Sequence, residues 1–363
     1  MPLSCGIVGL PNVGKTTIFN ALTRSAQALA ANYPFATIEP NVGEVAVPDP
    51  RLGVLQRLVS ARRIVPATVR FVDIAGLARG ASTGEGLGNA FLSHIRETDA
   101  IAMVVRCFDS EDVTHVEGRP DPRRDCEIVA IELALADLAT MRKRVAKLER
   151  EARAHSALGP YLEAAQRLTA ALEEARPARS FAAGSLELQV AADSFLLTSK
   201  PMLFVANVDE GQADAAGWVR VIQEIAAAEG GRAVVLSGQL EAELAGLPEN
   251  EASDFRRELG LARSGLDDLS AAAYDLLGLM TFLTAGPKEA RAWPIPKGTK
   301  ASRAAGTIHS DLERGFIRAE IVSFEDFERY GAMEALKAAG RVRSEGREYI
   351  MQEGDVVNFR FNV

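Results

Sequence analysis

The 363-residue sequence has few cysteines, and this limits the kinds of protein that it can encode. The three present are Cys5, Cys107 and Cys126, an odd number without the paired spacing of a metal site. Neither a disulfide framework nor a zinc site is therefore indicated. The pattern favours a reducing compartment.

Positive charge is also in short supply. The chain has 41 Lys and Arg against 49 Asp and Glu, which gives a formal net charge of -8. Attraction of the whole surface to nucleic acid is not expected, so any contact with RNA must come from a local basic face.

Long apolar runs are absent as well. No run approaches the roughly 20 residues of a membrane-spanning helix. Residues Met1–Gly9 lack the basic start and the cleavage site of a secretory signal. We therefore expect a cytoplasmic protein that does not contact membranes.

Short apolar runs alternate with helical patterns through much of the sequence. This alternation is typical of an α/β domain with a doubly wound parallel sheet. The six expected strands are Leu3–Val8, Val42–Val47, Thr68–Val72, Ile101–Val105, Met202–Val205 and Ala233–Leu236.

A long insertion rich in helix-forming residues, Pro122–Leu197, separates the fourth and fifth of these strands. Apolar residues recur in it every three or four positions, which predicts an antiparallel helical hairpin, with the turn expected at Gly159-Pro160. The recurring residues are Ile128, Ile131, Leu135, Leu138, Met141, Val145 and Leu148. The basic residues between them are either a solvated helix face or an RNA contact.

From Met280 onward, short β-like segments are punctuated by Gly and Pro, which predicts a small separate α+β domain. The expected strands are Met280–Leu283, Glu289–Trp293, Ala319–Val322 and Val356–Val363.

The strongest chemical signal is Gly9–Thr16, which matches G-x-x-x-x-G-K-[ST] between an apolar strand and the helical pattern Thr17–Leu22. Such a loop points successive main-chain N–H groups at phosphates, and the following helix adds its positive end. Lys15 supplies a positive charge, and Thr16 can place its hydroxyl on Mg²⁺.

Two further segments are expected to sense the terminal phosphate. In Phe71-Val72-Asp73-Ile74-Ala75-Gly76, Asp73 can hold a magnesium-bound water and Gly76 can offer its N–H to the phosphate. Between this segment and the phosphate loop, Thr37 is the candidate switch threonine that reaches Mg²⁺.

Base selection is expected at the end of the fifth strand. Guanine-specific relatives have N-K-x-D there, whereas this chain has Asn207, Val208, Asp209 and Glu210. A carboxylate one methylene longer does not keep the bidentate geometry to guanine, so guanine preference is expected to be lost. Asn207 can still hydrogen-bond a purine, and the Val208 main chain can meet an adenine amino group. Asp209 could substitute for the guanine carboxylate, which keeps an obligate GTPase as an alternative.

The group that orients the attacking water is not evident. Many small GTPases have Gln directly after D-x-x-G, but this chain has Leu77. The alternatives are His115, a monovalent cation such as K⁺ held beside Asn12, and a partner protein.

Five strings together resemble the YchF subfamily of Obg-related GTPases: G-L-P-N-V-G-K-T-T, N-Y-P-F-A-T-I-E-P-N-V-G, D-I-A-G-L-A-R-G-A-S-T-G-E-G-L-G-N, R-C-F-D-S-E-D-V-T-H-V-E-G and N-V-D-E. The resemblance extends to A-G-P-K-E-A-R-A-W and to G-D-V-V-N-F near the end of the sequence. It therefore covers almost the whole chain.

The resemblance implies three domains: a nucleotide domain of residues 1–121 and 198–278, an inserted coiled coil of 122–197, and a β-grasp TGS domain of 279–363. It also implies an ATPase that uses ATP in preference to GTP, associates with ribosomes and acts in translation or stress responses. We further expect a monomer that contacts the large subunit, with rRNA bound through a local basic face. The resemblance assigns Asn12, Val13, Gly14, Lys15, Thr16 and Thr17 to the phosphates and Asn207 and Val208 to the base, and the motifs themselves add Gly76 and Glu210 to the nucleotide contacts. Thr16 and Thr37 are the expected Mg²⁺ ligands, and Asp73 is expected to bind the ion through a water molecule. His115 and Lys15 are the expected catalytic residues.

One departure from the family concerns Ala36, where many members have cysteine, so redox control through that position is not expected. Two rival functions remain. One is a ribosome-docking protein in which nucleotide is only a structural ligand, and the other is a small-molecule kinase, which leaves the D-x-x-G switch and the C-terminal domain without a role.

Overall fold

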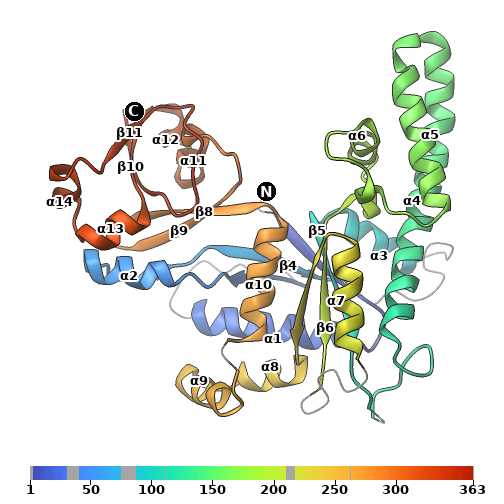
Figure 1. Ribbon diagram of the computed structural model, residues 1–363, viewed down its shortest axis with the longest axis horizontal. Coiled ribbons are helices and arrows are strands. Elements are labelled where there is room, and N and C mark those ends of the chain that lie inside the picture. The colour runs from blue at the N-terminus through green and yellow to red at the C-terminus, as the bar shows by residue number, and fades with distance from the viewer. Residues whose placement is uncertain are drawn as a thin grey trace. The chain divides into compact units, whose positions relative to one another are not determined.

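The computed structural model describes residues 3–30, 41–74, 87–110, 112–209, 217–261 and 263–362. The chain forms two compact units, coloured along the sequence in Figure 1. Unit 1 comprises Met1–Val45 and Arg70–Ala273, and unit 2 comprises Ala46–Val69 and Tyr274–Val363. Each unit has its own six-stranded sheet.

The sheet of unit 1 has the strand order β2-β4-β1-β5-β6-β7. Its strands are β2 (Val42–Ala46), β4 (Thr68–Asp73), β1 (Ser4–Val8), β5 (Ala100–Arg106), β6 (Met202–Asn207) and β7 (Arg232–Leu236). Neighbouring strands from β4 to β7 pair in parallel. Every residue of β1, β5 and β6 is buried, as expected for central strands covered on both faces. All six expected strands and the α/β P-loop fold are confirmed.

Helices pack around this sheet, and α1 contacts α8 while α4 contacts α7. The helices outside the insertion are α1 (Lys15–Ala30), α3 (Leu87–Arg96), α7 (Trp218–Ala228), α8 (Gly238–Leu244), α9 (Glu249–Glu258) and α10 (Gly265–Leu276). Among the described residues, no helix has both the length and the apolar character needed to cross a bilayer.

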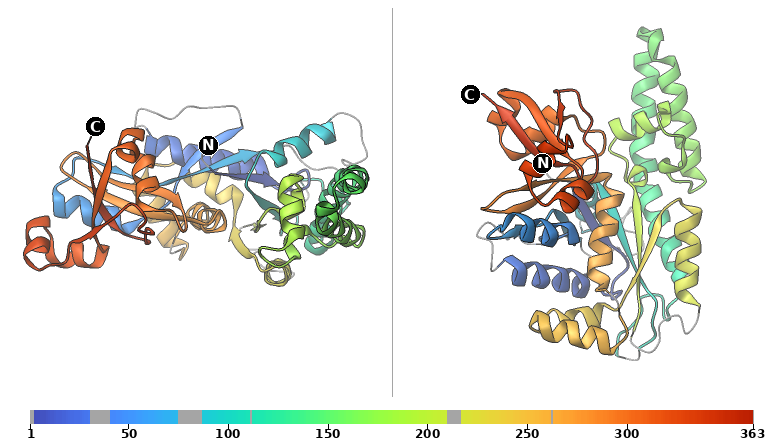
Figure 2. Two further views of the ribbon diagram at one scale, coloured as in Figure 1. Left: turned by 90° about the horizontal axis from the view of Figure 1, so that it is seen from above. Right: turned by 60° about the vertical axis from the view of Figure 1, so that its left-hand side comes forward.

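The insertion contains the predicted hairpin, in which α4 (Pro122–Ala154) packs along α5 (Gly159–Glu173), as Figures 1 and 2 show. A third helix, α6 (Leu186–Asp193), packs on α5. Asp121 caps α4 by accepting a hydrogen bond from the N–H of Arg124.

One expectation for the hairpin was wrong. Gly159-Pro160 is not the turn but the first turn of α5, where proline is favoured because its missing N–H needs no partner there. The turn is a 3-10 segment, Ser156–Leu158. Among the recurring apolar residues of α4, Ile131 and Leu135 are exposed, with 47% and 41% of their surfaces accessible.

Unit 2 has the strand order β11-β10-β12-β8-β9-β3. Its strands are β11 (Arg343–Glu345), β10 (Phe316–Val322), β12 (Val356–Phe361), β8 (Leu279–Ala285), β9 (Ala290–Pro296) and β3 (Ile64–Val65). Its helices are α2 (Pro50–Val59), α11 (Ala301–Ile308), α12 (Ser310–Arg314), α13 (Phe324–Tyr330) and α14 (Met333–Ala338). The core contains Phe282 stacked on Trp293 and packed edge-on against Phe359.

Residues 46–69 cluster with the C-terminal residues, although we expected all of residues 1–121 in the nucleotide domain. The cause is pairing, because Ile64 lies in parallel register with Ala290 of β9 and α2 contacts the same strand. The helical hairpin is grouped with unit 1, so its separation as a domain of its own stays a prediction.

Candidate functional site

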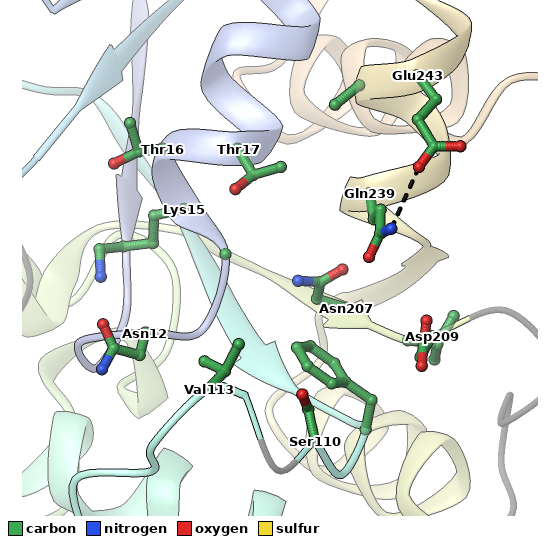
Figure 3. A pocket seen from close by; sticks show the side chains of 14 residues that line it. Asn12, Lys15, Thr16, Thr17, Ser110, Val113, Asn207, Asp209, Gln239 and Glu243 are labelled. Atoms are coloured by element: carbon green, nitrogen blue, oxygen red, sulfur yellow. Dashed lines mark hydrogen bonds between the residues drawn. The ribbon is translucent and has the colours of Figure 1, made fainter.

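The phosphate loop, residues 9–14, connects β1 to α1 and borders a cavity of about 580 Å³ in unit 1 (Figure 3). The fold brings five residues expected to bind phosphate to this cavity together with two residues expected to bind the base. The lining consists of Asn12, Gly14, Lys15, Thr16, Thr17, Phe108, Ser110, Val113, Asn207, Val208, Asp209, Gln239, Ala242 and Glu243.

The loop adopts a conformation that its residue types permit. Asn12 has φ 61° and Gly14 has φ 95°, both in the left-handed region that asparagine and glycine tolerate best. A Cβ on Gly14 would lie only 2.3 Å from Nδ2 of Asn207, so glycine is also required by space. Helix α1 then begins at once, with the N–H of Ile18 donating to the carbonyl oxygen of Gly14 at 3.0 Å.

Lys15 is buried at the start of α1, and its Nζ donates to the carbonyl oxygen of Leu10 at 2.6 Å. Desolvation by burial lowers the pKa of Lys15 to about 8, although the negative charge of Asp73 acts in the opposite direction. A buried ammonium bound to one neutral carbonyl is poorly compensated, which suits it to receive an anionic phosphate.

Thr16 and Asp73 meet at the other side of the loop, where the Thr16 hydroxyl donates to Asp73 Oδ2 at 3.2 Å. Asp73 Oδ1 is buried and has no hydrogen-bond partner among the described residues. Burial raises the pKa of Asp73, while the Thr16 hydrogen bond and the Lys15 charge lower it. A hydroxyl and a carboxylate with an unpaired oxygen are the hard oxygen donors that fit Mg²⁺.

No cluster of three or more His, Cys, Asp or Glu side chains able to hold a metal occurs among the residues described. Mg²⁺ commonly takes only one or two protein ligands and completes its shell with water and substrate phosphates, so Thr16 and Asp73 are a sufficient protein contribution. The further metal candidate Thr37 and the phosphate candidate Gly76 lie outside the described residues.

Asn207, at the end of β6, connects the phosphate loop to the first residue of α8. Its Nδ2 donates to the carbonyl oxygen of Val13 at 2.9 Å, and its Oδ1 accepts from the N–H of Gly238 at 2.8 Å. Asn207 was expected to hydrogen-bond the purine, and the structure gives it these two main-chain partners. Val208 lies beside it in the cavity wall, whereas Glu210 is outside the described residues.

Several lining residues were missed by the sequence analysis. Phe108, Ser110 and Val113 follow β5, and Gln239 and Glu243 lie on α8, where Gln239 Nε2 donates to Glu243 Oε1 at 3.2 Å. The available signal was positional, because ligands of open α/β sheets bind beyond the carboxyl ends of the strands. Residues following β5 and β7 were therefore candidates from topology alone.

His115 does not line the cavity and is buried against the start of α4. Its Nε2 lies 2.9 Å from Asp125 Oδ2, and its Nδ1 accepts from the N–H of Glu117 at 3.1 Å. Because Nδ1 is an acceptor, the ring proton of the neutral form is on Nε2 and is donated to Asp125. The neighbouring Thr114 carbonyl accepts from Asn12 Nδ2 at 3.1 Å, which links this segment to the phosphate loop.

Comparisons with known proteins agree with this site. Residues 4–145 match a family described as a 50S ribosome-binding GTPase, and residues 279–362 match YchF-GTPase_C, described as a protein of unknown function (DUF933).

Two curated relatives cover all of the chain and all of their own length. The chain is 50% identical over 367 residues to the "Ribosome-binding ATPase YchF" of Bacillus subtilis. It is 47% identical over 364 residues to that of Escherichia coli O157:H7.

Among solved structures, the Schizosaccharomyces pombe YchF GTPase superposes with a TM-score of 0.88 at 36% identity. That superposition covers 99% of this chain and 97% of the other.

Proposed function

The chain belongs to the YchF family of Obg-related P-loop nucleotide hydrolases, and we propose that it is a Mg²⁺-dependent ATPase that binds the ribosome in a nucleotide-dependent way. The observation that carries the catalytic part is the cradle in which Lys15, Thr16 and Asp73 converge at the phosphate loop. The ribosome is proposed as partner because relatives matched over their full length are named ribosome-binding ATPases.

Each residue of the cradle has a distinct task. The main-chain N–H groups of the loop and the start of α1 bind the β- and γ-phosphates. Lys15 exchanges the Leu10 carbonyl for phosphate oxygens, so its buried charge becomes paired. Thr16 and Asp73 would hold Mg²⁺, which when bound neutralises charge on the phosphate oxygens. Thr37 and Gly76 are proposed to complete the contacts to metal and terminal phosphate.

We propose that ATP is preferred over GTP. Supporting this, Val208 and Glu210 stand where guanine-specific relatives have Lys and Asp, and the Asn207 side chain already binds Val13 and Gly238. Purine recognition then falls on the main chain around Val208 and on Phe108. Competition of unlabelled ATP and GTP against a fluorescent ATP analogue tests this directly, and equal affinities would remove the proposal.

The water-orienting group remains a proposal with two candidates. His115 can act only if its hydrogen bonds to Asp125 and Glu117 break and the side chain reaches the cavity. K⁺ beside Asn12 is the alternative. Turnover is compared in K⁺ and in tetramethylammonium buffers for the wild type and for His115→Ala. If K⁺ orients the water, turnover falls in tetramethylammonium and His115→Ala has little effect. If His115 orients it, turnover falls in His115→Ala and does not depend on the cation.

Contact with the large subunit through rRNA is proposed to involve the exposed basic residues in the C-terminal half of α4. They are Arg142, Lys143, Lys147, Arg150 and Arg153. Ribosome pelleting with MgATP, MgADP or no nucleotide tests the nucleotide dependence. Lys15→Ala should lose the difference between nucleotides but keep basal docking, and a monomer is expected in both.

A second candidate function is a ribosome-docking protein in which nucleotide is only a structural ligand. The burial of His115 away from the cavity favours it. Under this alternative, Lys15→Ala pelleting would equal that of the wild type in every nucleotide state.

A further inference from the structure

We propose that Arg106 is a positioning residue that sets the base-side wall of the nucleotide cavity without touching the nucleotide. This inference rests on the proposed function, because it assigns the roles of the two sides of that cavity. Arg106 is absent from the cavity lining, yet three lining residues depend on it.

Arg106 occupies an unusual place for an arginine. It is the last residue of β5 and only 1% exposed, which makes it one of the largest fully buried side chains of the described chain. Arginine is rarely buried to this extent unless its donors are satisfied. It also lies in register with Asn207 on β6, and the next residue, Cys107, donates its N–H to the Asn207 carbonyl at 2.8 Å.

The guanidinium group binds the main chain of the segment that follows β5. Nε donates to the carbonyl oxygen of Phe108 at 3.1 Å, and Nη1 donates to that of Val113 at 2.8 Å. A longer contact of 3.4 Å joins Nη2 to the carbonyl of Ser110. The same group lies 4.6 Å from the centroid of the Phe108 ring, so it fixes both the main chain and the side chain of Phe108.

These contacts explain why arginine is required. A planar guanidinium presents five donors in a rigid fork, so it can serve several carbonyl groups in one plane and stack on a ring as well. A lysine ammonium is a point charge on a flexible stem and does not reproduce that fork. Burial lowers the pKa of Arg106, and the nearby charges of Asp109 and Asp125 counteract it, so the group stays protonated.

Phe108, Ser110 and Val113 approach the cavity from β5, whereas Lys15 and Thr16 approach from β1 and α1. The two sides are joined by a hydrogen bond from Asn12 Nδ2 to the Thr114 carbonyl, but within the described chain the Arg106 guanidinium donates to neither Lys15 nor Thr16. Loss of Arg106 should therefore loosen the base side far more than it weakens phosphate binding. A residue needed only for folding would weaken both together.

The experiment uses the full-length chain with Arg106→Lys and Arg106→Met, and Arg220→Met as a matched control. Arg220 is exposed on α7 and pairs with Glu224 one helical turn away. Two probes are titrated in the presence of Mg²⁺: ATP, and inorganic tripolyphosphate, which has no base. Steady-state hydrolysis is measured on the same proteins.

For Arg106→Met we expect the Kd and KM for ATP to rise about 10- to 100-fold, the range that an unpaired set of buried polar groups produces. The tripolyphosphate Kd and kcat at saturation should change less than threefold. Arg106→Lys should recover only part of the ATP affinity, and Arg220→Met should match the wild type.

Unchanged ATP affinity in both variants would overturn the inference, as would parallel losses for ATP and tripolyphosphate. Should Arg106→Met fail to fold, Arg106→Lys alone decides the question: its Kd for ATP must rise by a larger factor than its Kd for tripolyphosphate. A wild type that binds neither probe would instead defeat the proposed function, so the two failures are distinguishable.

Discussion

Lys15 shows how a binding residue is held ready before its ligand arrives. The ammonium is buried and donates to the Leu10 carbonyl, and burial lowers its pKa to about 8. In the ligand-free protein this pKa lies below the usual value of 10.5. The unfolded chain therefore binds more protons here between these two values, and the contribution of Lys15 to folding stability rises with pH across that window.

The same shift predicts proton uptake on nucleotide binding. A bound polyphosphate raises the pKa of Lys15, so binding takes up protons near and above pH 8. ATP affinity should then fall by up to about tenfold per pH unit above pH 8. Calorimetry in buffers of different ionisation enthalpy measures the uptake. Lys15→Met should abolish it, whereas Lys143→Met on α4 should not.

Thr16 and Asp73 give a second prediction at the residue scale. Replacing the hydroxyl in Thr16→Val removes a metal donor while keeping the shape of the side chain. The Mg²⁺ concentration that gives half-maximal hydrolysis should rise by about tenfold or more. Thr16→Ser keeps the hydroxyl and should remain close to the wild type. An unchanged Mg²⁺ requirement in the valine variant would mean that Thr16 is not a ligand.

The residues of the phosphate cradle could be predicted from sequence because a main-chain anion site demands a fixed glycine pattern between a strand and a helix. The surroundings of His115 and Asn207 could not. Asn207 meets Val13 from 194 positions away, which only the fold brings about, and Asp125 is ten residues from His115 but on a helix whose direction the sequence does not give. Phe108 escaped notice because a single aromatic residue after a strand has no motif of its own.

At the scale of elements, the end of α5 offers a test of backbone strain. Ala175 has φ 57°, directly after the helix, where glycine is the usual residue. Ala175→Gly should raise the free energy of unfolding by about 1 kcal/mol, because glycine adopts the left-handed conformation without the steric clash of a Cβ.

The matched control is Ala170→Gly, inside α5 and exposed, which should destabilise by about 1 kcal/mol. Urea unfolding followed by circular dichroism measures both. If the two variants shift stability in the same direction, the left-handed position of Ala175 is not strained.

All six strands of the unit 1 sheet were located within two residues at each end. Three of them, β1, β5 and β6, are buried at every position, while β2, β4 and β7 alternate buried and partly exposed residues, and both patterns are typical of strands. The two-residue β3 and the three-residue β11 have too few positions to show a period. In α4, Ile131 and Leu135 continue the apolar spacing but are exposed. Apolar spacing predicts which face of a helix is apolar, but it does not say whether another element covers each residue of that face.

At the scale of the whole molecule, the two tryptophans provide one reporter for each unit. Trp218 begins α7 of unit 1, and Trp293 is buried in unit 2. Because the cavity is lined by unit 1 alone, MgATP at 100 times its Kd should add about 2.7 kcal/mol to the stability of that unit. In Trp293→Phe, the remaining tryptophan fluorescence comes from Trp218. The unfolding temperature followed by this fluorescence should then rise by about 5–10 °C when MgATP is added.

Trp218→Phe, which reports Trp293, is the companion measurement and should shift less. Identical shifts in the two variants would show that the units unfold as one cooperative system. Tripolyphosphate in place of ATP gives a control for stabilisation through the phosphate loop alone.

The way unit 2 is assembled from two separated stretches bears on how the chain is synthesised. Residues 46–69 leave the ribosome early, but β9, which pairs with β3, is not made until residues 290–296. Domains generally form in the order in which they emerge. During most of translation, β3 and α2 are therefore present in the nascent chain without β9, the strand that they pack against. We expect this stretch to be a binding site for chaperones during elongation.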